Sequence, residues 1–162
     1  MQHTISILVV NRFGVLSRIS GLFSGRGFNI ESLNVAETND PEISRMTIVT
    51  IGDESKVEQI TKQLNKLVDV IKVIDLTEEN FVDRELILVK MNAEPRVREE
   101  ILRIVEIFRS KVVDVSASTY TIEITGDQSK IKGFLDLLRP LGIKEVVRSG
   151  RIAVSRGTKS IN

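Results

Sequence analysis

Residues 11–29 read NRFGVLSRISGLFSGRGFN, and this stretch joins two apolar segments through one short helix. The sequence Gly25-Arg26-Gly27 predicts the end of that helix. Apolar side chains recur at the spacing of an amphipathic helix of about three turns, so we expect one face in a hydrophobic core. They are Val15, Leu16, Ile19, Leu22 and Phe23. The stretch therefore predicts a strand–helix–strand unit that organises the first half of the chain.

Gly14 lies where the chain turns from the apolar segment at residues 4–10 into this helix. The first N–H groups of a helix have no intrahelical partner, so a small anion could bind beside a residue without a side chain. Asn11 ends the preceding strand and Asn29 begins the next, and suitably arranged strands would place both amides near this helix end. An amide donates and accepts hydrogen bonds, which suits a zwitterion such as an amino acid. Aliphatic neighbours could receive the side chain of that ligand: Val15, Leu16 and Ile30.

The first half of the chain predicts the order strand, helix, strand, strand, helix, strand. The apolar alternation slips between Ile30 and Leu33, which indicates a bulge in the second strand. Residues 39–41 (Asn-Asp-Pro) predict a hairpin turn, and Asp53 predicts the N-cap of the second helix. This order is typical of a ferredoxin-like unit with two helices on one face of an antiparallel sheet.

The second half repeats the order, with one helix beginning at Pro95 and another after Asp127. The fold class is therefore α+β, with two tandem ferredoxin-like βαββαβ domains. We expect the first domain at residues 1–77 and the second at 84–157. Residues 158–162 carry no apolar periodicity, and we expect them to form a loose tail.

Composition narrows the classes of function. The chain of 162 residues has no cysteine, which fits a reducing, cytoplasmic setting. Its net charge is only +1, which gives nucleic-acid binding little electrostatic support. No apolar run approaches a membrane span, and no signal peptide is expected. His3 lies near the terminus, where a surface position is more usual than a catalytic or ligand role. The last stretch is mildly basic, which fits a solvated face or an acidic partner surface.

An enzymatic function has few candidate residues. Asp40 and Glu42 flank a proline, where turn formation is a sufficient reason for the aspartate. Arg12 beside the helix start could cradle an acyl phosphate. RNA-recognition modules share this strand order, but the phenylalanines fall in turns, connectors and helix faces rather than on central strands. No catalytic residue, metal site or cofactor is expected, and the simplest alternative is that Asn11, Gly14 and Asn29 only shape strand ends and a turn.

Several motifs carry a family resemblance. The segments NxxGxLSR at 11–18, GLFS at 21–24 and RGFNIESL at 26–33 resemble the ACT domain of the small regulatory subunits of acetolactate synthase (acetohydroxyacid synthase). The resemblance continues through SRMTI at 44–48 and QLNKLVDV at 63–70, and more weakly through ELILVK at 85–90, EIFR at 106–109, RSG at 148–150 and SRG at 155–157.

The resemblance implies a protein without a reaction of its own. Such a subunit binds the large thiamine-diphosphate-dependent catalytic subunit, raises its activity and confers feedback inhibition by valine in branched-chain amino acid biosynthesis. It also implies a homodimer with the effector between two ACT domains. Asn11, Gly14, Val15 and Leu16 of one chain would then face Asn29 and Ile30 of the other. Valine, leucine and isoleucine stay open as effectors, because one methylene changes affinity only modestly, and a stand-alone amino-acid sensor stays open as a function.

Overall fold

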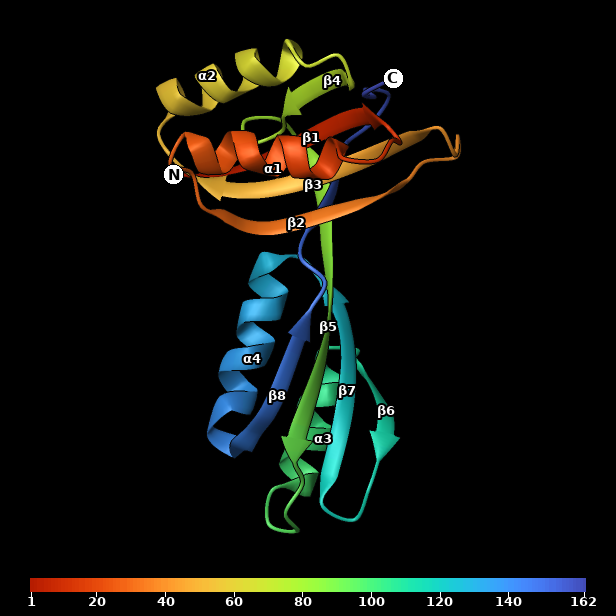
Figure 1. The fold of residues 1–162 in the computed structure, drawn as a ribbon. Helices are drawn as coiled ribbons and strands as arrows, with labels where there is room; N and C mark the ends of the chain where they lie inside the picture. The colour runs from red at the N-terminus through yellow and green to blue at the C-terminus, as the bar shows by residue number, and fades with distance from the viewer. The chain divides into compact units, whose positions relative to one another are not determined.

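The computed structural model describes residues 1–162 and divides into two compact units. The first unit comprises Met1–Val82 together with Arg151–Asn162, and the second comprises Asp83–Gly150. Both contain strands and helices in the order βαββαβ, which confirms the predicted α+β class and the repeated unit (Figure 1). No helix of the structure is both long enough and apolar enough to cross a membrane.

The first unit is an antiparallel four-stranded sheet in the order β2-β3-β1-β4. Helices α1 and α2 cover one face of it (Figure 1). The predicted bulge is confirmed, because the register between β2 and β3 shifts between Ile30 and Ser32. The elements are β1 (Gln2–Val10), α1 (Val15–Gly25), β2 (Ile30–Glu37), β3 (Ile43–Ile51), α2 (Glu54–Asn65) and β4 (Val70–Asp75).

Side chains alternate along the central strand β1 and define the two faces of this sheet. Ile5, Ile7 and Val9 point toward the helices and join the core with Phe23 and Ile60. Residues 4, 6 and 8 point to the opposite face and are also buried. Both faces of β1 are therefore covered.

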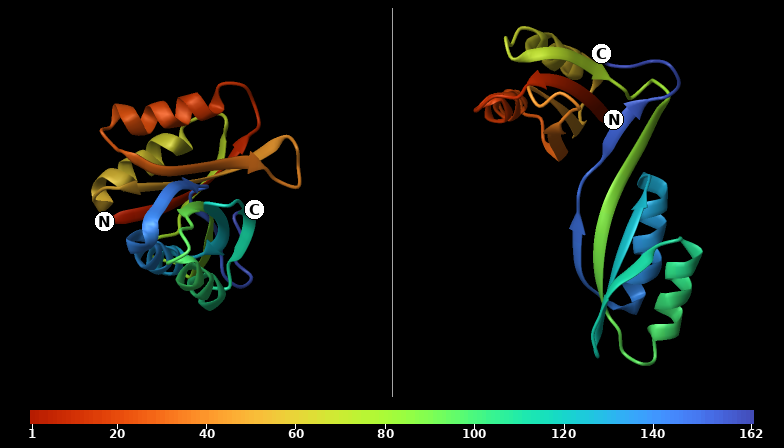
Figure 2. Two further views of the ribbon diagram at one scale, coloured as in Figure 1. Left: turned by 90° about the horizontal axis from the view of Figure 1, so that it is seen from below. Right: turned by 90° about the vertical axis from the view of Figure 1, so that its right-hand side faces the viewer.

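The second unit has its own sheet and core. Its strands pair in the order β6-β7-β5-β8, and α3 and α4 lie side by side over one sheet face (Figure 2). The helix predicted to begin at Pro95 begins instead at Arg98, because the N–H of Val97 donates to the Glu94 carbonyl (3.0 Å) and closes a turn first. The elements are β5 (Phe81–Asn92), α3 (Arg98–Ile107), β6 (Lys111–Val115), β7 (Thr119–Gly126), α4 (Gln128–Gly142) and β8 (Ile143–Arg148).

The C-terminal segment, residues 151–162, belongs to the first unit and includes β9 (Ile152–Ser155). Asn34 Nδ2 in β2 donates to the Arg151 carbonyl (3.2 Å), and Arg45 Nη2 in β3 donates to the Ala153 carbonyl (3.0 Å). These side chains lie on the sheet face opposite the helices, as the register requires. The segment thus contacts the second face of this sheet, and its strand β9 pairs with β5.

The expectation of a loose tail at residues 158–162 is wrong. Ile161 is only 5% exposed, and Lys159 Nζ pairs with Glu79 Oε1 at 2.8 Å. Ile161 is the single buried apolar residue of these five, and one residue forms no periodic pattern, so the sequence could not predict that this segment packs. The C-terminal residues are anchored to the first unit.

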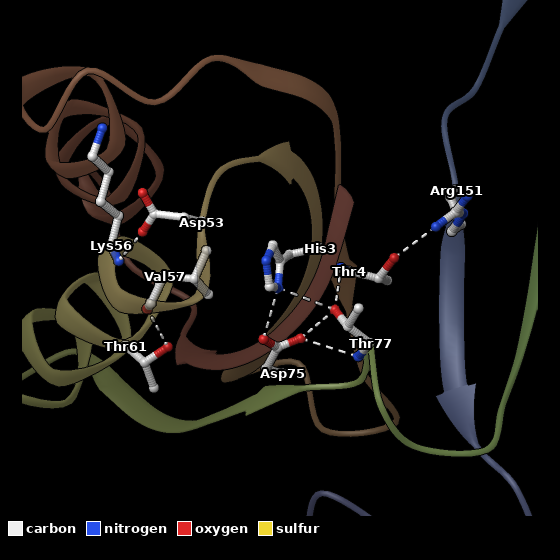
Figure 3. A network of polar contacts seen from close by, with 9 residues as sticks. All are labelled: His3, Thr4, Asp53, Lys56, Val57, Thr61, Asp75, Thr77 and Arg151. Carbon is white, nitrogen blue, oxygen red and sulfur yellow. Dashed lines mark hydrogen bonds and ion pairs between the residues drawn. The ribbon is translucent and has the colours of Figure 1, made fainter. Parts of the chain in front are cut away.

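The surface position expected for His3 is also wrong. The side chain is buried, with Nδ1 3.1 Å from Asp75 Oδ2, and Nε2 has no hydrogen-bond partner. Figure 3 shows how the contact extends: Thr77 Oγ1 accepts the Thr4 N–H (3.1 Å), and Arg151 Nη1 donates to Thr4 Oγ1 (2.6 Å). A polar network therefore joins β1, the end of β4 and the C-terminal segment.

The N-cap of α2 gives a pH-dependent prediction. Asp53 Oδ1 accepts the Lys56 N–H (2.9 Å) and the Ser55 hydroxyl (2.7 Å), and these bonds hold the pKa of the Asp53 carboxyl below its ordinary value. A depressed folded-state pKa contributes stability above the unfolded pKa and loses it as the pH falls. The gap in unfolding free energy between wild type and Asp53→Ala should be constant above about pH 5 and shrink below about pH 4.

Urea titrations across pH measure this gap. Asp114→Ala is the matched control, because that exposed carboxylate makes no hydrogen bond or ion pair in the structure. A gap for Asp53→Ala that does not change with pH would contradict the capping role.

The buried C-terminal residue gives a stability prediction. Ile161→Ala should lower the free energy of unfolding by about 2 kcal/mol, because it removes apolar side-chain volume from a closed site. Val154→Ala, at a side chain that is 48% exposed, should change it by less than about 0.5 kcal/mol. Denaturant unfolding measures both variants, and equal small effects would mean that the segment does not pack as described.

Candidate functional site

The turn from β1 into α1 leaves helix donors without a side-chain cap. Gly14 is the N-cap residue, has a left-handed φ of 85°, and offers no side chain to accept a hydrogen bond. No acidic residue occupies the first turn of α1. The partial positive charge of this helix end is therefore not balanced from within the helix, which favours an anion. The left-handed φ gives a physical reason for glycine at this position.

A buried carboxylate lies beside this turn and was not identified from the sequence. Asp69 is 7% exposed, and its carboxylate contacts the guanidinium groups of Arg18, in direct contact, and of Arg12, at 3.6 Å. The Asp69 carbonyl also accepts the N–H of Val10 (2.8 Å). Asp69 and Arg18 are 51 positions apart, so no local spacing could have paired them. From the sequence alone, Arg12 was a residue that could bind an acyl phosphate. In the structure its guanidinium lies beside the Asp69 carboxylate instead.

Asn11 is held by the β2–β3 turn. Its Nδ2 donates to the Pro41 carbonyl (2.9 Å) and to Glu37 Oε1 (3.3 Å), and its backbone N–H donates to the Glu42 carbonyl (2.7 Å). The amide nitrogen thus has a structural role within the chain, as the simpler alternative allowed. The amide oxygen has no partner within the chain.

Asn29 lies at the other end of the sheet from Asn11. Its carbonyl accepts the Thr50 hydroxyl (2.7 Å), whereas Asn11 is bonded to Glu42 at the opposite end of β3. Glu42 and Thr50 are eight positions apart along extended chain, or roughly 25 Å. The strands are therefore not arranged so that both amides could meet at one helix end of the same chain. The cause is β3, which runs antiparallel to β1 and β2 between them.

The apolar members of the predicted site are divided between core and surface. Val15 is buried and belongs to the core of the first unit, whereas Leu16 is 42% exposed next to it. Ile30 is half-buried against the same core at the Asn29 end. Within one chain, Gly14, Val15 and Leu16 are together, and Asn29 and Ile30 form a separate group.

The basic residues of the C-terminal stretch mostly have partners within their own unit. Arg148 Nε pairs with Glu85 (2.6 Å), Arg139 with Asp136 (3.0 Å), and Lys159 with Glu79. Arg45, which holds the C-terminal segment, donates to a hydroxyl and a carbonyl rather than to a carboxylate, and burial lowers the pKa of its guanidinium. These contacts favour a structural reading of the basic stretch.

Two further features of the structure bear on ligand binding. No group of three or more His, Cys, Asp and Glu side chains is arranged to hold a metal ion. An open depression of about 470 Å³ lies between the end of α1 and one face of α2, away from the predicted site. Its lining is basic and amidic: Arg26, Gln59, Lys62, Gln63, Asn65 and Lys66.

Comparison with known proteins covers both units. Residues 5–72 match the family model of the AHAS small subunit-like ACT domain, and residues 84–157 match that of the small subunit of acetolactate synthase. The chain is 53% identical over 156 residues to the acetolactate synthase small subunit of Aquifex aeolicus, covering 96% of this chain and 81% of that protein. It is 49% identical over 162 residues to that of Haemophilus influenzae, covering 99% of each.

A solved structure supports the same assignment. The crystal structure of an acetolactate synthase small subunit from Thermotoga maritima superposes with a TM-score of 0.88 at 42% identity, covering 98% of this chain and 99% of that one. Both family models, the full-length relatives and the shared fold agree. The chain therefore belongs to the acetolactate synthase small-subunit family, and its first unit contains an ACT domain of that family.

Proposed function

We propose that this protein is the regulatory subunit of acetolactate synthase in branched-chain amino acid biosynthesis. It binds the large catalytic subunit in the cytoplasm, raises its activity and confers feedback inhibition by valine, without a reaction or a cofactor of its own. The observation that carries this proposal is the match of both units to the small-subunit family over nearly the full chain. The absence of cysteine fits a reducing compartment.

The effector site is completed by a second copy of the chain. β2 is an edge strand, so its outward backbone groups have no strand partner within the chain. In a two-fold antiparallel pairing of β2 edges, the start of one strand meets the end of the other, where Glu37 contacts Asn11. Asn29 of the partner subunit then approaches Asn11 and Gly14. Within one chain Asn29 lies too far from both residues to do so.

The proposed site matches the groups of an aliphatic amino acid. The ligand carboxylate binds at the uncapped start of α1 beside Gly14, and the amide oxygen of Asn11 accepts from the ligand ammonium. Asn29 and Ile30 of the partner subunit close the site, and Leu16 contributes exposed apolar surface. Val15 supports the site from the core beneath it.

Regulation follows from linkage between the two subunits. Valine can shift the holoenzyme only by the difference between its affinities for the active and inhibited arrangements. The inhibited arrangement therefore holds the dimer site more tightly closed around valine. By reciprocity, binding of the catalytic subunit changes the affinity for valine by the same factor.

Gly14 gives the sharpest test of the site. Gly14→Asp places a carboxylate where the ligand carboxylate binds, and Gly14→Asn places a neutral group of nearly the same shape there. Both residues tolerate a left-handed φ better than other side chains do. Gly14→Asp should abolish valine inhibition, Gly14→Asn should weaken it less, and both should keep activation of the catalytic subunit. Acetolactate formation by the reconstituted holoenzyme measures both properties, and wild-type inhibition in Gly14→Asp would refute the site.

Asn29 tests the contribution of the second chain. Asn29→Ala removes an exposed amide that makes no side-chain hydrogen bond within its own chain, so its loss should not affect the fold. Valine affinity should fall about tenfold or more, because a hydrogen bond to the charged effector is lost. Calorimetric titration with valine, leucine and isoleucine measures this loss and ranks the effectors. Asn39→Ala, at an exposed turn asparagine, is the matched control. Equal affinities for both variants would exclude Asn29 from the site.

A further inference from the structure

We propose that Arg18 binds the carboxylate of the effector and that Asp69 is the positioning residue that holds Arg18 in place. This inference rests on the proposed effector site at the start of α1. It adds two residues to that site, one of which touches the ligand and one of which acts through the other.

Arg18 lies over the turn where the ligand carboxylate is proposed to bind. Its backbone N–H donates to the Gly14 carbonyl (3.1 Å), and its guanidinium Nη2 is 3.8 Å from the position that a Cβ on residue 14 would occupy. The Arg18 side chain is 55% exposed, so a ligand can reach it. Only Nη1 contacts Asp69, which leaves Nε and Nη2 as donors. A guanidinium suits this role, because its planar fork can donate two parallel bonds to a carboxylate.

Asp69 holds the Arg18 guanidinium in place through an ion pair. Its side chain is 11% exposed, and its two oxygens face Arg18 and Arg12 separately. Because the Asp69 carbonyl also holds the N–H of Val10, the same residue ties the end of β1 to the second turn of α1. Arg18 would otherwise be a long side chain near the helix surface with many rotamers, and ordering it on ligand binding would cost affinity.

The charge at this point favours an added anion. Two arginines face one carboxylate, and the start of α1 adds partial positive charge with no acidic residue in its first turn. The cluster therefore has one positive charge in excess beside Gly14. An incoming carboxylate balances that excess without displacing Asp69, since Arg18 retains free donors. The same geometry refines the Gly14→Asp test, because the new carboxylate would pair with Arg18 and occupy the place of the ligand carboxylate.

The experiment removes the proposed bond between the ligand carboxylate and Arg18 in two ways, by changing the ligand and by changing the protein. Valine and valinamide share the ammonium and the side chain, but valinamide carries a neutral amide instead of a carboxylate. Calorimetric titration of the full-length protein with each ligand gives their affinity ratio. In Arg18→Gln the preference for valine should fall about tenfold or more while the affinity for valinamide stays close to wild type. Arg18→Lys should restore part of that preference, because it restores the charge without the fork.

Asp69→Asn separates positioning from simple charge. Removing a negative charge near the site would by itself strengthen carboxylate binding, whereas loss of a held guanidinium weakens it. We expect the valine preference to fall. Arg26→Gln, at the exposed residue that caps the other end of α1, is the control and should leave the ratio unchanged.

Each outcome decides between the proposals. An unchanged ratio in Arg18→Gln, or a raised ratio in Asp69→Asn, overturns the corresponding role. A lower melting temperature of a variant with an unchanged ratio assigns that residue to the fold alone and also overturns its role. Failure of the wild-type protein to bind valine would instead overturn the proposed function.

Discussion

The alternation of side chains along β1 is the constraint on which the first unit depends. One set faces the helices and forms the core, and the other faces the C-terminal segment. Because a one-residue slip would exchange the two sets, both coverings fix the register of the same strand. That register in turn fixes where β1 ends, and therefore where the chain turns at Gly14 and which helix donors are left free.

The elements could be predicted from the sequence because periodicity is local. Apolar spacing identified α1 and α2, Asp53 marked an N-cap, and the slip at Ile30 marked a bulge, and each is confirmed. The predicted start of α3 at Pro95 was wrong, because a proline is common in the first turn of a helix and also in a turn just before one. The C-terminal segment could not be predicted, since its contacts join residues more than 100 positions apart, such as Asn34 and Arg151 (117 positions).

The proposed site shows the same limit. Gly14, Val15 and Leu16 are consecutive, so the sequence alone was enough to group them. From residue spacing alone, Asn11 and Asn29 could share one helix end, whereas the family resemblance placed them on opposite chains. The strand order shows how far apart they lie within one chain. Asp69 lies in a segment of the family resemblance, but the sequence assigned it no role, because one aspartate before a strand is ordinary until its burial and its arginine partners are known. Sites assembled from distant segments require the topology, and a site shared by two chains requires the assembly as well.

The chain path has a consequence for synthesis. The second unit is continuous in sequence, whereas the first is interrupted by it and closes only with residues 151–162. Every residue of the later unit is therefore synthesised before the segment that covers the second sheet face of the earlier one. The N-terminal unit, usually the first to fold during translation, thus needs the last residues of the chain for its final closure. A chain shortened to residue 150 would contain every residue of the second unit and an ACT sheet with one face bare.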